Sequence, residues 1–158
     1  MAIIVNNVFN TAYSPYGNGS ASYSPIIALG ESWAYYMGHF MADLRYGLQS
    51  SQPKSEQGIN FYNSSSASAH INVLEGFNPN YTADPFKWIP KGIYLDLRDA
   101  TVENTPVIDQ VSNYTNQQLF NVFLSSVTTL PAYKTKLLQA TSNSTSANVP
   151  NLFAQYGY

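Results

Sequence analysis

One segment, Ser24-Pro25-Ile26-Ile27-Ala28-Leu29-Gly30-Glu31-Ser32-Trp33-Ala34-Tyr35-Tyr36-Met37-Gly38-His39-Phe40, carries the strongest helical pattern in the chain. Ser24 can cap a helix and Pro25 suits its first turn, so a helix is predicted over about residues 25–48. Its larger apolar side chains fall on one broad face: Ile26, Leu29, Trp33, Tyr36, Met37, Phe40, Leu44 and Leu48. The opposite face is small and nearly uncharged: Ala28, Glu31, Ala34, Tyr35, Gly38 and Ala42. Such a helix is predicted to be covered on both faces.

Further helices are predicted toward the C-terminus. Thr115-x-x-Gln118 matches a capping box, and the apolar stripe behind it is Leu119, Phe120, Val122, Phe123 and Val127. Helices are also predicted over about residues 131–141, with Tyr133, Leu137 and Leu138 inward, and over about 150–156, ending at Gly157. A short helix is predicted within residues 91–99, whereas residues 6–25 and 50–68 are turn-rich. The predicted fold is mainly α with long loops, and residues 1–158 form a single domain or the C-terminal fragment of a larger domain.

The composition excludes several classes of protein. Charged residues make up only 10% of the 158, against about 25% in typical domains, and the formal net charge is −2. No basic run could neutralise a series of phosphates, so a nucleic-acid partner is not expected. No apolar run reaches the length of a membrane-spanning helix, and the absence of cysteine excludes disulfides and thiolate metal sites.

The composition also suggests a location. A cysteine-free chain rich in Asn, Ser, Thr and Tyr is typical of extracytoplasmic proteins, at the cell surface, in the periplasm or secreted. The first residues lack the basic and apolar regions of a signal peptide, so we expect the export signal to be missing from this chain. Five Asn-x-Ser/Thr triplets begin at Asn18, Asn63, Asn80, Asn113 and Asn143. They are either glycosylation acceptors or, the favoured interpretation, chance in such a composition.

The sequence has few groups for catalysis. It contains two histidines, His39 and His70, and lacks both a Gly-x-Ser-x-Gly elbow and a phosphate-binding glycine loop. Both histidines are interpreted as structural residues. The pairs Asp96/Asp99 and Glu103/Asp109 are either a cation site or, as favoured here, solvated surface carboxylates, because their spacing matches no calcium loop.

Glu31 is the exception, because a lone carboxylate on a small-residued helix face is costly to bury unless it is paired or bound to a metal. Gly30-Glu31-Ser32-Trp33-Ala34 resembles the ligand helix of gluzincin-type zinc metallopeptidases, in which the glutamate is the third zinc ligand. Residues 30–36, with the ending at 151–158, are similar to Bacteroidetes-type surface proteins of metallopeptidase character. The resemblance implies the C-terminal helical part of a zincin-like fold, zinc in the complete protein, and a peptide or protein substrate.

Within this resemblance Glu31 is the candidate metal ligand and Tyr35 the candidate catalytic residue. Tyr35 lies one turn along the helix and could hydrogen-bond to Glu31 or to a substrate oxyanion. The chain departs from the family pattern because it has no His-Glu-x-x-His segment. We therefore expect this chain alone to bind no catalytic zinc and to be inactive, and whether the protein is an enzyme stays open.

Two further hypotheses concern partners. The alternative function is a non-catalytic extracellular glycan-binding, peptide-binding or scaffold domain. It is motivated by tyrosines in the polar loops: Tyr13, Tyr16, Tyr23, Tyr62 and Tyr81. Self-association through the Glu31 face of the helix is also expected, because an uncovered small and apolar face favours contact with another surface.

Overall fold

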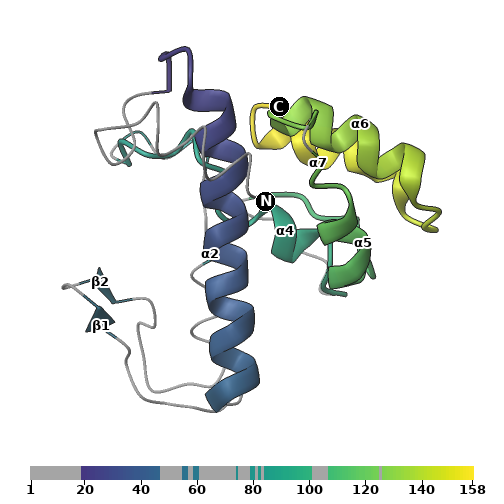
Figure 1. The fold of residues 1–158 in the computed structure, drawn as a ribbon, viewed down its shortest axis with the longest axis horizontal. Coiled ribbons are helices and arrows are strands. Elements are labelled where there is room, and N and C mark those ends of the chain that lie inside the picture. Colours follow the sequence, from purple (N-terminus) through teal and green to yellow (C-terminus); the bar gives the residue numbers. More distant parts are fainter. Residues whose placement is uncertain are drawn as a thin grey trace.

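The structure is a computed structural model, and it describes residues 19–46, 55–56, 59–60, 74, 79–80, 82, 84–100, 107–124 and 126–158. These residues form the following elements (Figure 1): α2 Ser24–Tyr46, β1 Ser55–Glu56, β2 Ile59–Asn60, α4 Ile93–Asp96, α5 Asn116–Asn121, α6 Leu130–Ala140, the 3-10 turn η1 Ser146–Asn148 and α7 Val149–Gln155. The two short strands pair antiparallel, with Ser55 opposite Asn60. The prediction of a mainly α fold is confirmed. No helix in these ranges is long and apolar enough to span a bilayer.

The core forms where α2 meets α4 and α6. Trp33 of α2 lies edge-on to Tyr94 of α4, with ring centroids 5.1 Å apart and planes at 85°. Tyr94 is in turn edge-on to Tyr133 of α6, at 5.3 Å and 89°. Phe123 closes the cluster, 4.8 Å from Trp33 and 4.9 Å from Tyr133. Edge-to-face pairs of this kind contribute about 0.5–1.5 kcal/mol each beyond the burial of their surface, so this cluster fixes the three helices against one another.

Threonine side chains begin α5 and α6. The Thr115 hydroxyl accepts a hydrogen bond from the Gln118 amide at 3.2 Å, and the Gln118 side chain accepts one from the Thr115 amide at 2.8 Å. The predicted capping box is therefore confirmed. The Thr129 hydroxyl caps α6 in the same way, accepting from the Ala132 amide at 3.2 Å.

The helix α7 ends where the sequence predicts, just before Gly157. Gly157 adopts a left-handed backbone conformation, with φ of 86°. Its amide donates to the Ala154 carbonyl at 3.0 Å, and the Tyr158 amide donates to the Phe153 carbonyl at 2.8 Å. These two hydrogen bonds make a Schellman motif, so the predicted helix stop at Gly157 is confirmed.

Among the described residues, α2 is covered on only part of its two faces, so the prediction that both faces are covered stays a prediction for the rest. Leu44, predicted to be inward, is 64% exposed, because the last turns of α2 extend past the other helices (Figure 1). Ala34 and Gly38 on the opposite face are also exposed, whereas Ala28 is buried. The helix is thus covered near its N-terminal half, and its small-residued face is only partly shielded.

The predicted stripe after Thr115 also needs correction. Leu119 is fully buried, but Phe120 is 46% exposed. The helix α5 ends at Asn121, so the residues that follow do not continue one helical face. Val122 and Val127 still enter the core, from non-helical backbone.

Two glycines give a matched test of this packing. A Cβ on Gly92 would lie 2.5 Å from the Tyr156 hydroxyl and 2.6 Å from the Leu74 carbonyl oxygen, whereas one on Gly38 would meet no atom within 4 Å. Gly92→Ala is therefore expected to lower the free energy of unfolding by about 1–3 kcal/mol, since the Tyr156 hydroxyl must leave Asp96. Gly38→Ala is expected to raise it by about 0.5–1 kcal/mol, through lower entropy of the unfolded chain. Urea unfolding measures both; a neutral Gly92→Ala would contradict the close packing.

Candidate functional site

Glu31 lies on the partly shielded face of α2, and its side chain is half-buried. Burial raises the pKa of its carboxyl above the ordinary value of 4.5, because removal from water disfavours the charged form. Within the described part of the chain, no hydrogen bond or ion pair to this carboxylate offsets that cost. Glu31 is therefore a partly desolvated anion without a stabilising partner among these residues.

Tyr35 lies one turn further along α2, on the same face as Glu31. The Lys91 ammonium is 5.5 Å from the centroid of the Tyr35 ring, a cation–π contact. Lys91 also forms an ion pair with Asp84 at 3.2 Å. The turn that precedes α4 therefore covers the Tyr35 end of this face, and the catalytic role of Tyr35 stays a prediction.

The described residues do not assemble a zinc site around Glu31. His39 is buried, 8% exposed, and lies eight residues further along the same helix, which is about 12 Å along the axis. Zinc ligands lie only about 2 Å from the ion, so Glu31 and His39 cannot share one. His70 lies outside the described residues. No group of three His, Cys, Asp or Glu residues that could hold a metal occurs in the ranges searched.

The interpretation of Asp96 and Asp109 as solvated carboxylates is wrong. Asp96 is 2% exposed and accepts a hydrogen bond from the Tyr156 hydroxyl at 2.7 Å. Asp109 is 1% exposed and accepts one from the Val111 amide at 2.8 Å. Both carboxylates thus serve the fold, one joining α4 to α7 and the other closing a turn. Asp99 is half-buried, and Glu103 lies outside the described residues.

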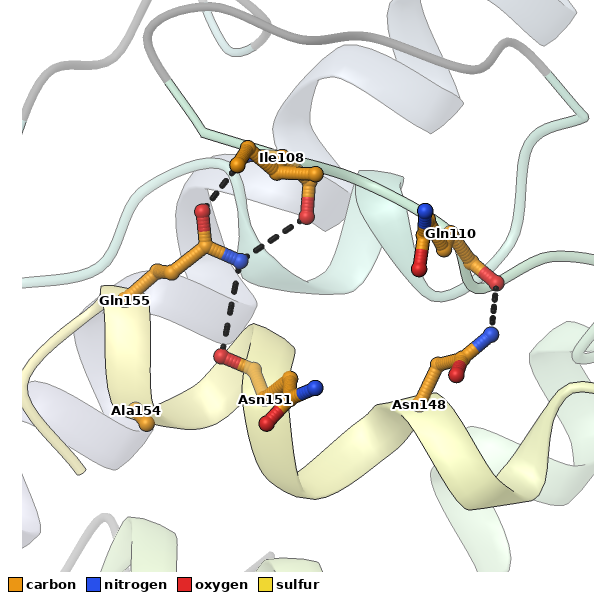
Figure 2. A pocket seen from close by; sticks show the side chains of 6 residues that line it. All are labelled: Ile108, Gln110, Asn148, Asn151, Ala154 and Gln155. Carbon is orange, nitrogen blue, oxygen red and sulfur yellow. Dashed lines mark hydrogen bonds between the residues drawn. The ribbon is translucent and has the colours of Figure 1, made fainter.

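A second candidate site lies where an extended segment, residues 107–111, runs beside α7 (Figure 2). The Gln155 carboxamide accepts from the Ile108 amide at 2.6 Å and donates to the Ile108 carbonyl at 2.8 Å. The Asn148 carboxamide donates to the Gln110 carbonyl at 2.9 Å. These two side chains thus make hydrogen bonds to the segment's backbone that a neighbouring β-strand would otherwise make.

An open hollow of about 540 Å³ lies between this segment and α7, and Figure 2 shows its lining: Ile108, Gln110, Asn148, Asn151, Ala154 and Gln155. Four of these six residues carry a carboxamide and none is charged. The sequence analysis did not identify this site. The only signal was the high content of Asn and Gln near the C-terminus, and composition does not place side chains on opposite sides of a hollow.

Comparison with known proteins adds no relative. No family model, no curated protein and no solved structure matches this chain.

The Glu31 carboxylate predicts a pH-dependent effect on stability. The pKa of Glu31 is higher in the folded state than in the unfolded state, so folding takes up protons at pH values between the two. The free energy of unfolding therefore falls as the pH rises from the unfolded-state pKa to the folded-state pKa. Glu31→Gln removes this cost, so it is expected to raise the free energy of unfolding at pH 7.5, by less than about 1 kcal/mol because solvent screens the half-exposed group. At pH 3.5, where the glutamate is protonated in both states, little change is expected.

Urea unfolding of wild type and variant at the two pH values measures this difference. The matched control is Asp84→Asn, which removes the ion pair with Lys91 and is expected to lower stability at pH 7.5 by up to about 1 kcal/mol. A loss of stability in Glu31→Gln at pH 7.5 would show that the carboxylate has a favourable partner.

Proposed function

We propose that this chain is the C-terminal helical part of a zinc-metallopeptidase-like surface protein, in which Glu31 supplies the third zinc ligand. The observation that carries the proposal is the partly desolvated carboxylate of Glu31, for which the described residues provide no partner. A metal ion would offset the cost of that burial, because a bound cation favours the ionised form. The resemblance of residues 30–36 to the gluzincin ligand helix points in the same direction.

The shape of the helix face supports a second element packing against it. Ala34 lies three residues after Glu31 and Gly38 lies four residues after Ala34, so they share one face of the helix, and both are exposed. Small side chains of this kind allow another backbone to approach closely. Met41 and Leu44, further along α2, are 59% and 64% exposed and add apolar surface for such a contact. The proposed occupant is a segment that brings the two histidine ligands and the general base; self-association of two copies is the alternative.

Tyr35 is the candidate catalytic residue in this proposal. Its position one turn from Glu31 allows its hydroxyl to orient the carboxylate or to stabilise a developing oxyanion. The neighbouring Lys91 ammonium keeps positive charge close to the ring. Because this ammonium is paired with Asp84, it adds little net charge to the face.

Zinc calorimetry on the 158-residue chain tests the proposal. Wild type and Glu31→Gln are both expected to lack a tight site, with any dissociation constant weaker than about 1 μM. A tight site that Glu31→Gln abolishes would mean that this chain holds a complete set of ligands, and would overturn the proposed dependence on another segment. Asp84→Asn is the control for a nonspecific loss of a carboxylate.

The coding sequence around the chain provides the complementary test. The proposal predicts a His-Glu-x-x-His helix encoded in frame before Met1 or in an adjacent gene for a partner. If it is found, the assembled protein should retain stoichiometric zinc on dialysis, and Glu31→Gln should lose it. Absence of this motif from both places would overturn the proposal.

A further inference from the structure

The carboxamide-lined hollow between residues 108–110 and α7 is built from elements that the proposed zinc function does not use. Its framework is fixed: Gln155 holds both polar groups of the Ile108 peptide, at 2.6 and 2.8 Å, and Asn148 holds the Gln110 carbonyl at 2.9 Å. A binding site gains affinity when its groups are already ordered before the ligand arrives. The hollow therefore has an ordered framework.

Two further carboxamides border this framework from opposite sides. Gln110 projects from the extended segment and Asn151 from α7 (Figure 2). Both are exposed, and within the described residues neither carboxamide makes a hydrogen bond. Each offers two N–H donors and one carbonyl acceptor. Together they can donate to and accept from hydroxyl groups of one ligand.

The hollow also has an apolar contribution. Ile108 is 51% exposed although it lies in a segment whose neighbours Val107 and Asp109 are buried. Ala154, the other apolar lining residue, is small and exposed on α7. The C–H face of a sugar ring presents apolar surface that matches such side chains, while its hydroxyl groups match the carboxamides.

We propose that this hollow binds a neutral carbohydrate. A charged ligand is disfavoured because the lining has no charge to neutralise it. An extended peptide would have to add its backbone to the segment, but the Ile108 amide and carbonyl and the Gln110 carbonyl are already bonded to side chains. A ligand that offers hydroxyl groups rather than a strand edge avoids this conflict.

Amide resonances in a ¹H–¹⁵N spectrum of the full chain provide the test. Four neutral trisaccharides serve as probes: maltotriose, cellotriose, chitotriose and mannotriose. At least one is expected to shift the resonances of Ile108, Gln110, Asn151 and Ala154, with a dissociation constant in the range of about 1–10 mM. Trigalacturonate, which is acidic, and an extended Ala-Val peptide are expected to leave them unchanged.

Variants assign the effect to the hollow. Asn151→Ala and Gln110→Ala are each expected to weaken binding about 3–10-fold, the loss of one or two hydrogen bonds. Both residues are exposed, and the spectrum itself reports whether the fold is kept. Gln139→Ala, an exposed carboxamide of α6 outside the hollow, is the control and is expected to bind as wild type. Glu31→Gln should also bind as wild type, which separates this proposal from the zinc proposal.

Three results would overturn the proposal. The first is that no neutral trisaccharide shifts these resonances up to about 20 mM. The second is binding that neither Asn151→Ala nor Gln110→Ala weakens. The third is that trigalacturonate or the peptide shifts the same resonances as strongly as the sugars do.

Discussion

Tyr94 is the residue on which the arrangement of the helices depends. Its helix, α4, has only four residues, far fewer than an isolated helix needs to be stable in water. The Tyr94 ring is completely buried between Trp33 of α2 and Tyr133 of α6, edge-on to both. Tertiary packing therefore holds α4 in place, and α4 in turn fixes the distance between the long helix and the C-terminal helices. Burial also raises the pKa values of Tyr94 and Tyr133, so both rings stay neutral at ordinary pH.

The position of α4 also determines both candidate sites. Just before it, Lys91 reaches the Tyr35 ring and covers part of the Glu31 face. Within it, Asp96 accepts the hydrogen bond from Tyr156, which anchors the end of α7 beside the extended segment. The hollow depends on that anchor, because α7 supplies three of its lining residues. Burial of the Tyr94 ring thus positions α4 for both candidate sites, the Glu31 face and the neutral hollow, although these sites share no residues.

Local signals in the sequence predicted the elements with clear ends. The Thr115/Gln118 box, the apolar face of α2 through Trp33 and Tyr36, and the stop at Gly157 are all properties of a few neighbouring residues. Local pattern failed where burial is decided by distant partners. In the segment 107–111 the apolar Ile108 is exposed and the charged Asp109 is buried, the reverse of what polarity suggests.

The cause of this inversion is hydrogen bonding. Asp109 turns inward to accept a hydrogen bond from the Val111 amide, while Gln155, 47 residues away from Ile108, bonds to the backbone of Ile108.

For the Glu31 site, the sequence predicted the helix but not the surroundings of the carboxylate. The sequence identified the residue and its face, but the half-buried state of the carboxylate depends on tertiary packing, which a helical pattern does not specify.

Low charge and abundant carboxamides explain how these two sites differ. A neutral carboxamide can bond to buried backbone without the large desolvation cost of an ion, so Asn148, Gln155 and Asn143 can tie loops together at little cost. A surface built this way produces a weak long-range field, and its recognition must depend on short-range hydrogen bonds. Glu31 differs from the buried carboxylates of Asp96 and Asp109, because no described residue makes a hydrogen bond to it. The Glu31 face and the hollow therefore differ in chemistry, because one has a half-buried carboxylate and the other has only neutral carboxamides and apolar side chains.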